Sequence, residues 1–174
     1  MKNFMSISFM FLSITTFLLS ISQCAVVPSD ANLIQQICKR TPNFDLCVTS
    51  LASDPQSSTA DVNGLALIMV DVLKAKATST LNLINQQLTK SPALKQPLTS
   101  CASNYNAILT ADIPEGIEAL QKGDPKFAET GANDAAVEAD ICEAGFKGKS
   151  PLTNSNKLVH DTSAVTAAIV RNLL

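Results

Sequence analysis

The sequence predicts an all-α fold, an up-down-up-down four-helix bundle preceded by a disulfide-stapled helical hairpin. Apolar residues recur at intervals of three and four, the period of a helix, and no segment after residue 24 has the character of a strand. Ala, Leu, Lys and Gln are frequent, whereas aromatic residues make up 5% of the chain, a composition that favours helices. Four long helices with short connections pack most simply as such a bundle.

Residues 1–24 have the layout of a secretory signal peptide. A lysine precedes an apolar run over residues 4–21, and Ser22 and Cys24 place small residues before the expected cleavage site. A membrane anchor is the alternative, because the run approaches spanning length, but no basic stop-transfer cluster follows it. The predicted mature chain, residues 25–174, is one domain of 150 residues, long enough for a hydrophobic core.

The predicted mature chain is mildly acidic. Without Lys2, 12 basic residues face 15 acidic ones, a formal charge of −3. Nucleic-acid binding is not expected, since it normally requires a basic stripe and the sequence has none. No Asn-X-Ser/Thr sequon is present, so N-glycosylation is not expected either.

Four cysteines remain after signal removal: Cys38, Cys47, Cys101 and Cys142. An even number in an oxidising pathway predicts two disulfides. Of the three possible pairings, Cys38–Cys47 with Cys101–Cys142 is favoured, because the first pair is close enough to close a helical hairpin. Loop entropy predicts that the bridges stabilise the fold by about 2.7 and about 3.9 kcal/mol. A zinc site is not expected, because Cys-X-X-Cys spacing is absent.

The predicted hairpin occupies residues 25–58. A short helix over residues 31–38 is broken at Thr41-Pro42, and a second over residues 44–51 is closed by Asp54-Pro55. The Cys38–Cys47 bridge would hold the two helices together.

The bundle, residues 59–174, is predicted to begin with a helix that runs to about Lys90, with Thr59 or Asp61 as its N-cap. The predicted inner stripe of this helix is Val62, Leu65, Ile68, Met69, Val72, Ala75, Lys76, Ser79, Leu83 and Gln86.

A second bundle helix is predicted to start at Ser91-Pro92 and to stop at Gly123. We expect Pro114 to kink this helix rather than end it, because the apolar period resumes afterwards. Its predicted inward residues are Leu94, Leu98, Cys101, Tyr105, Ile108 and Leu109.

The third helix is predicted from Pro125 to about Phe146, weakened near Gly131 and with Cys142 and Phe146 on one face. The last runs from about Thr153 to Leu173. Its predicted buried residues are Leu158, Thr162, Val165, Ile169 and Leu173.

The sequence offers little material for catalysis. His160 is the only histidine, and neighbours in a helix point apart, so His160 and Asp161 are not expected to form an acid–base pair. No phosphate loop, nucleotide fingerprint or zinc-protease motif is present. The sequence therefore predicts no enzyme, no cofactor and no metal. The following carboxylates are expected to lie along helix surfaces without converging partners: Glu115, Glu118, Asp124, Glu129, Asp134, Glu138, Asp140 and Glu143.

The segment GDPKFAE, residues 123–129, joins the second and third bundle helices. Asp124 is expected to cap the third helix, and Pro125 to take its first position, where a missing N–H costs nothing. Lys126 and Phe127 then lie in the first turn, at a corner of the bundle. The local sequence leaves two alternatives. Phe127 folds inward while Lys126 is solvated, or the two residues form a rigid anchor for a cleft on another protein.

The four-cysteine arrangement, with CKRTPNFDLC in the hairpin, resembles the plant invertase and pectin methylesterase inhibitor family over essentially the whole mature chain. The segments LALIMVDVLKAKA, ILTADIPEGIEALQKGDPKFAE and AAIVRNLL resemble its invertase-inhibitor branch, and GDPKFAE is the most discriminating. The resemblance implies a four-helix bundle with an N-terminal hairpin. It also implies disulfides that join the first cysteine to the second and the third to the fourth.

In that branch, the Pro-Lys-Phe turn enters the sucrose-binding cleft of an acid invertase, a beta-fructofuranosidase. The resemblance therefore implies that Pro125, Lys126 and Phe127 bind the target in the cell wall (apoplast) or the vacuole. One alternative is inhibition of pectin methylesterase, with contacts along the bundle's helices. Another is a secreted carrier or structural bundle without an enzyme target.

Overall fold

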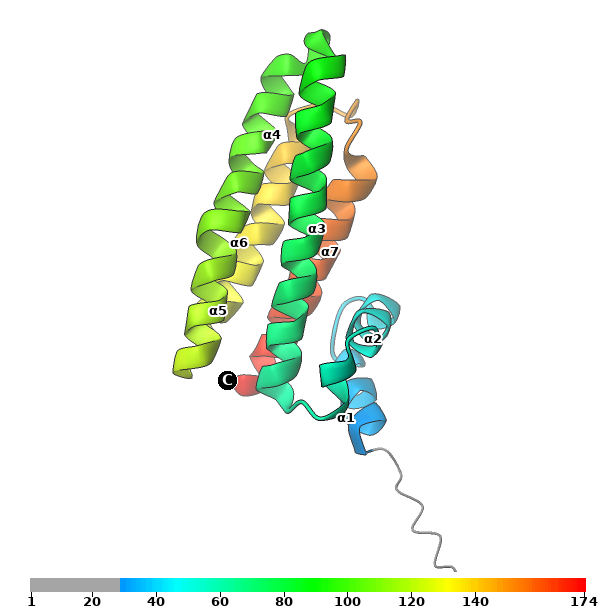
Figure 1. Ribbon diagram of the computed structural model, residues 1–174, viewed down its shortest axis with the longest axis vertical. Helices are drawn as coiled ribbons and strands as arrows, with labels where there is room; N and C mark the ends of the chain where they lie inside the picture. Colours follow the sequence, from blue (N-terminus) through cyan, green and yellow to red (C-terminus); the bar gives the residue numbers. More distant parts are fainter. Residues whose placement is uncertain (1–28) are drawn as a thin grey trace, which may run out of the picture.

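The computed structural model describes residues 29–174, which form a four-helix bundle with a helical hairpin beside one end (Figure 1). The predicted signal peptide, residues 1–24, lies outside the described residues. The predicted all-α fold class is confirmed. In chain order the elements are α1 (Ser29–Cys38), α2 (Phe44–Ala52), η1 (Pro55–Ser58), α3 (Val62–Lys90), η2 (Pro92–Leu94), α4 (Lys95–Ala107), η3 (Ile108–Asp112), α5 (Ile113–Lys122), α6 (Pro125–Ala144), α7 (Thr153–Val170) and η4 (Arg171–Leu173).

Helices α1 and α2 form the predicted hairpin, which lies beside the lower part of α3 in Figure 1. The predicted bridge between Cys38 and Cys47 joins them, with the two Cα atoms 5.5 Å apart. Asn43 caps α2, because its side-chain oxygen accepts a hydrogen bond from the Leu46 N–H. Leu51 is fully buried against the bundle. The hairpin therefore shares the core of the bundle.

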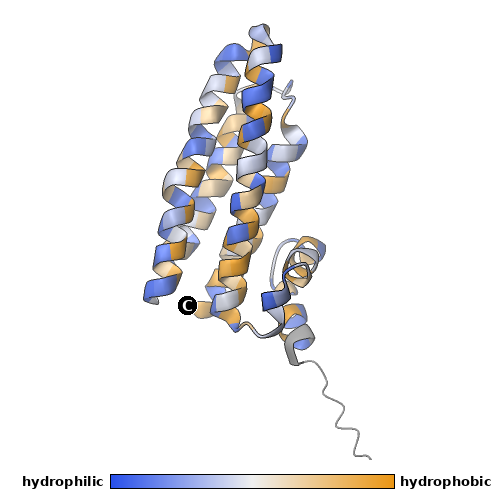
Figure 2. Ribbon diagram, viewed as in Figure 1, coloured by the Kyte–Doolittle hydropathy of each residue, from blue (hydrophilic) through white to orange (hydrophobic). Residues whose placement is uncertain are grey.

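Asp61, one of the two predicted N-caps, caps helix α3, because its carboxylate accepts a hydrogen bond from the Gly64 N–H at 2.8 Å. Figure 2 shows that the first half of α3 is rich in hydrophobic residues and its second half in hydrophilic ones. The predicted inner stripe is correct at Leu65, Ile68 and Met69. Val62, Val72 and Leu83 are half-buried and pack against the core, whereas the prediction is wrong for Ala75, Ser79 and Gln86, which are exposed. The buried residues are Leu65, Ala66, Ile68, Met69, Val70, Leu73, Ala77, Thr80 and Ile84.

The error in the stripe has a geometric cause. The predicted positions advance mostly by three residues, and each such step falls about 60° short of a full turn. The buried positions Leu65, Met69, Leu73 and Ala77 advance by four. Because apolar residues are sparse in the second half of α3, the sequence gives little indication of which spacing applies.

Helices α4 and α5 form one continuous rod with η3 between them, as predicted for a helix that Pro114 does not end (Figure 1). The turn η3 is a π turn, closed by the Ile113 N–H, which donates to the Ile108 carbonyl. A π turn widens the coil immediately before a proline that lacks an N–H and crowds the preceding turn. The predicted inward residues Leu98, Cys101, Tyr105 and Ile108 are buried, and Leu94 and Leu109 are half-buried.

Helix α6 is continuous, so Gly131 does not weaken it as predicted. Gly131 is buried where α6 passes the π turn. A Cβ atom added there would lie 2.6 Å from the Asp112 carbonyl oxygen and 3.7 Å from the Gly116 nitrogen. The cavity beside these residues measures only about 10 Å³, about the space of one water molecule. The absence of a side chain at Gly131 therefore lets α6 pack closely against the rod formed by α4, η3 and α5.

The second predicted disulfide, Cys101–Cys142, joins α4 to α6 with Cα atoms 4.6 Å apart. Beside it, the Tyr105 hydroxyl donates to the Asn156 side-chain oxygen at 2.8 Å, and the Asn156 amide donates to Glu143 at 2.7 Å. Tyr105 is fully buried, and burial raises the pKa of its phenol. This network connects α4, α6 and α7 within the core.

Helix α7 runs back down the bundle and ends in η4 (Figure 1). Three of its five predicted inward residues are buried: Thr162, Val165 and Ile169. Leu158 is exposed and Leu173 is half-buried, so the prediction is wrong for Leu158. Val159 takes the buried position instead. Adjacent apolar residues at 158 and 159 do not indicate which of the two faces the core.

We expect Gly131→Ala to lower the free energy of unfolding by about 1–2 kcal/mol, because overpacking against backbone outweighs the higher helix propensity of alanine. Gly116→Ala is the matched control, since a Cβ at Gly116 meets no atom within 4 Å. This control should be neutral or stabilising by up to about 1 kcal/mol. Urea unfolding measures both changes, and equal stability of the two variants would contradict the close-approach argument.

Asp112 ends the π turn, and its Oδ2 atom is buried without a hydrogen-bond partner among the described residues. Burial, together with the negative charges of Asp134, Glu138 and Glu115, raises the pKa of Asp112 from 3.8 to about 6. The folded protein therefore binds this proton more tightly than the unfolded chain. The contribution of Asp112 to stability is most favourable below pH 3.8 and declines as the pH rises to about 6.

Asp112→Asn should remove this component of the pH dependence. In the parent protein we expect Asp112 to reduce the free energy of unfolding by about 1–2 kcal/mol across that interval, after allowance for solvent screening. Urea unfolding at a series of pH values checks the slope. Asp71→Asn, which removes an exposed charge from α3, is the control and should keep the slope of the parent. If Asp112→Asn also keeps that slope, the pH dependence of the free energy of unfolding comes from groups other than Asp112.

Candidate functional site

The turn between α5 and α6 is the candidate site, and backbone hydrogen bonds fix its shape. Gly123 adopts a left-handed conformation, with φ 76°, which favours glycine. The Gly123 N–H donates to the Leu120 carbonyl at 3.4 Å, and the Asp124 N–H donates to the Ala119 carbonyl at 2.9 Å. This pair of bonds is a Schellman motif. It ends α5 and orients the chain that follows.

Pro125 occupies the first turn of α6, as predicted, and restricts the backbone where the new helix begins. The prediction for Asp124 is wrong, because its side chain makes no capping hydrogen bond to α6. The backbone N–H of Asp124 is instead used to close α5.

Lys126 and Phe127 both point away from the core. The Phe127 residue is 55% exposed, so the inward-folded alternative is wrong. The Lys126 side chain is 69% exposed, and its ammonium lies 2.8 Å from Glu129 Oε2. The turn therefore presents an aromatic ring beside a cation, on a backbone that is fixed at both ends.

Phe127 forms one wall of an open surface groove of about 330 Å³. The other lining residues are Glu115, Glu118, Ala119, Lys122 and Asp124. Lys122 pairs with Glu118, and this pairing lowers the pKa of the Glu118 carboxyl. The surroundings of the turn are thus mostly acidic on the α5 side.

Glu129 lies behind the turn with two charged partners that the sequence did not indicate. It is only 8% exposed, and its two oxygens contact two cations. Oε2 accepts a hydrogen bond from Lys126 at 2.8 Å, and Oε1 accepts one from Arg171 Nε at 2.7 Å. The hydrogen bonds from Lys126 and then Arg171 lower the pKa of Glu129. The prediction that the carboxylates lack converging partners is therefore wrong for this residue.

Glu143 is a second exception to that prediction. Burial raises the pKa of Glu143, but hydrogen bonds from Thr153 and Asn156 outweigh burial, and the net change is a lower pKa. The Thr153 hydroxyl donates to Glu143 at 2.6 Å. This carboxylate belongs to the core network beside the second disulfide, far along α6 from the turn.

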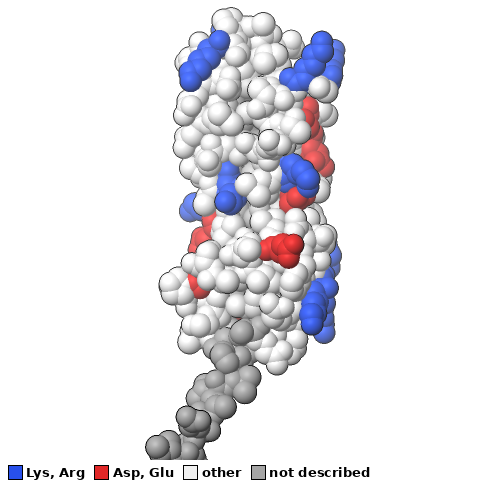
Figure 3. Space-filling model, turned by 90° about the vertical axis from the view of Figure 1, so that its right-hand side faces the viewer, with Lys and Arg blue, Asp and Glu red and all other residues white. Residues whose placement is uncertain are grey.

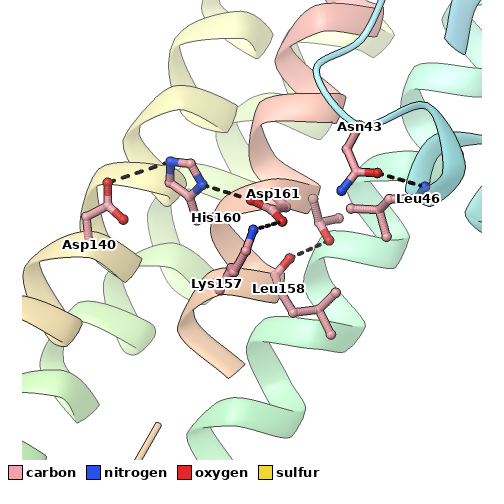
Figure 4. A network of polar contacts seen from close by, with 8 residues as sticks. Asn43, Leu46, Asp140, Lys157, Leu158, His160 and Asp161 are labelled. Atoms are coloured by element: carbon pink, nitrogen blue, oxygen red, sulfur yellow. Dashed lines mark hydrogen bonds and ion pairs between the residues drawn. The ribbon is translucent and has the colours of Figure 1, made fainter. Parts of the chain in front are cut away.

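His160 links α6 to α7 rather than forming a catalytic group (Figure 4). Its Nε2 atom lies 3.7 Å from Asp140 Oδ2, and its Nδ1 atom lies 3.3 Å from Asp161 Oδ1. The prediction that His160 and Asp161 point apart is wrong, because the Asp161 carboxylate turns back toward the ring. Asp161 also pairs with Lys157. Within the described chain, no serine, threonine or cysteine side chain is hydrogen-bonded to His160.

On the face shown in Figure 3, basic and acidic side chains lie scattered, and the described residues form no basic stripe there. Across residues 29–174, no cluster of three or more His, Cys, Asp or Glu side chains could hold a metal ion. No helix in the same range has the length and apolar character to cross a membrane.

Comparison with known proteins gives a consistent result. The family described as plant invertase/pectin methylesterase inhibitor matches residues 32–173. "Cell wall / vacuolar inhibitor of fructosidase 1" of Arabidopsis thaliana is 52% identical over 141 residues, 81% of this chain and 69% of that protein. "Pectinesterase inhibitor" of Actinidia deliciosa is 30% identical over 139 residues, 79% of this chain and 75% of that protein.

Among solved structures, a mutant form of a pectin methylesterase inhibitor from Arabidopsis shares the fold, with a TM-score of 0.70 and 24% identity. The match covers 79% of this chain and 95% of that one. The family and the more similar relative are inhibitors, so this protein is not an enzyme. From the match over residues 32–173, the chain belongs to the plant invertase/pectin methylesterase inhibitor family.

Proposed function

We propose that the protein inhibits a plant acid invertase, and that Pro125, Lys126 and Phe127 occupy the sucrose-binding cleft of that enzyme. The observation that carries the proposal is the exposed, backbone-fixed turn in a chain that is 52% identical to an inhibitor of fructosidase. Because the turn is ordered before binding, little conformational freedom is lost when it enters a cleft.

The chemistry of the three residues suits a glycoside hydrolase. Such enzymes work with paired carboxylates on either side of the scissile bond. A lysine ammonium can donate charge-assisted hydrogen bonds to carboxylates in a partly desolvated cleft. The Phe127 ring would cover an apolar wall that receives a sugar face, and Pro125 restricts the backbone that carries both side chains.

The proposed site of action is the secretory pathway, with the cell wall as the favoured destination and the vacuole as the alternative. The relative from Arabidopsis is named for both compartments. Two disulfides suit an oxidising environment.

Pectin methylesterase is the second candidate target, because a relative at 30% identity is a pectinesterase inhibitor. In that case the contact surface is expected along the bundle's helices, and the turn would be dispensable. Titrating each purified enzyme with the oxidised protein separates the candidates. Loss of pectin methylesterase activity alone would overturn the invertase proposal, as would loss of activity in neither assay.

We expect Lys126→Ala to raise the inhibition constant for plant acid invertase by about tenfold or more, because a charged contact at the centre of the interface is lost. Lys157→Ala is the matched control. Like Lys126, the Lys157 side chain is largely exposed, at 70%, and pairs with an acidic residue on its own helix. Lys157 lies in the first part of α7, at the end of the bundle opposite the α5–α6 turn (Figure 1). Sucrose hydrolysis at acidic pH measures both, and equal inhibition by the two variants would exclude Lys126 from the mechanism.

Phe127→Ala should also raise the inhibition constant by about tenfold, since it removes the aromatic surface that would contact the cleft wall. Thermal stability should remain nearly unchanged, because the ring is largely exposed. Ile141→Ala is the control, as Ile141 lies on the same helix and is 50% exposed. A comparable loss of inhibition in Ile141→Ala would show that the interface is not centred on the turn.

A further inference from the structure

The buried carboxylate behind the turn suggests how Lys126 is presented. Glu129 lies three residues after Lys126, so both side chains are on one face of α6. Arg171 belongs to η4 and lies 42 residues after Glu129 in the sequence, yet its Nε atom is 2.7 Å from Glu129 Oε1. The Lys126 ammonium lies 2.8 Å from the other oxygen of the same carboxylate. Glu129 thus connects the turn to the last helical turn of the protein.

We propose that Arg171 and Glu129 are positioning residues for Lys126: Arg171 holds the Glu129 carboxylate in place, and this carboxylate orients the Lys126 ammonium at the turn. The inference rests on the proposed function, in which Lys126 contacts the target. Arg171 acts through Glu129 and does not itself bind the invertase.

The first argument for this arrangement concerns order. An ordinary surface ion pair must immobilise two long side chains and gains little stability. Lys122 and Glu118 form such a pair, and both are largely exposed. Glu129 differs because it is buried and already held by Arg171. Only the Lys126 side chain remains to be ordered, so its contact with Glu129 restricts the position of the ammonium.

The second argument concerns charge. Lys126, Glu129 and Arg171 together carry a net charge of +1. Without Arg171, Glu129 would neutralise Lys126, and the turn would lose its positive charge. Three acidic residues line the groove beside Phe127 against one basic residue, Lys122, which pairs with Glu118. The surroundings therefore supply no net positive charge of their own. Arg171 therefore keeps the turn cationic, as binding to an acidic cleft requires.

A double-mutant cycle tests the inference. The inhibition constant for plant acid invertase is measured for the parent, Arg171→Ala, Lys126→Ala and the double variant. We expect Arg171→Ala to raise the constant by about fivefold when Lys126 is present, and to change it by less than about twofold when Lys126 is absent. An equal increase in both backgrounds would show that Arg171 acts on the fold or contacts the enzyme directly, and would overturn the inference. No increase in either background would also overturn it.

Arg40→Ala is the matched control for charge. Arg40 donates a hydrogen bond to the side chain of Asn172, the residue next to Arg171, at 3.0 Å. This variant removes one positive charge from the same end of the bundle without removing a contact of Glu129. Its inhibition constant should stay within about twofold of the parent. An increase equal to that of Arg171→Ala would attribute the effect to general electrostatics and overturn the inference.

Glu129→Gln tests the same link from its centre and retains the shape of the side chain. Its amide oxygen can still accept the hydrogen bond from Arg171, but its amide nitrogen cannot accept one from Lys126. The substitution also raises the net charge of the three residues from +1 to +2, so it separates orientation from charge. We expect weaker inhibition when Lys126 is present, because the ammonium loses the carboxylate oxygen that orients it. Tighter inhibition would show that Glu129 competes with the target for Lys126 and would overturn the inference.

The proposed function and the inference fail in different ways. If Lys126→Ala inhibits as well as the parent, the proposed role of Lys126 and the positioning role both fall. If Lys126→Ala is weak and Arg171→Ala is not coupled to it, only the positioning role falls. Thermal unfolding of every variant shows whether it is folded, and Arg171→Lys, which keeps the charge, should recover part of the inhibition.

Discussion

The close packing of α6 against the rod formed by α4 and α5 is the constraint on which the candidate site depends. Gly131 allows this approach, because any side chain there would meet the Asp112 carbonyl. The bridge between Cys101 and Cys142 joins α6 to α4 in the same rod, farther from the turn. Because α6 and the rod are held together at Gly131 and at this bridge, the α5–α6 turn has little freedom to move. The structure thus explains why a surface turn can be rigid without being buried.

Features set by local chemistry could be predicted from the sequence. Gly123 and Pro125 are the residues that a helix end and a helix start require, and the helices end and begin there. The disulfide pairing was predictable because Cys38 and Cys47 are separated by only nine positions. The buried face of α3 was not predictable beyond its first turns, because too few apolar residues mark that face after Leu73.

Features that depend on tertiary contacts were not predictable. Glu129 and Arg171 are 42 residues apart, and no local pattern connects them. Glycine has low helix propensity, so Gly131 was predicted to weaken α6. In the structure its backbone packs directly against the rod formed by α4 and α5, and the packing requires that Gly131 has no side chain. Asp112 gave no signal either, since its burial depends on a π turn that the sequence did not indicate. In each case, the surroundings of the residue are set by a partner that the fold, and not the local sequence, places beside it.

The fold by itself cannot determine which enzyme the protein inhibits. A pectin methylesterase inhibitor has the same fold at only 24% identity, so the core can be built from very different sequences. Discrimination between targets must then come from residues that the core does not require. Phe127 is such a residue, because a ring that is 55% exposed contributes little to packing. An aromatic ring on a backbone fixed at both ends, beside a cation held by a buried carboxylate, offers a partner a contact that is already ordered. Target choice is therefore expected to depend on this turn rather than on the bundle that carries it.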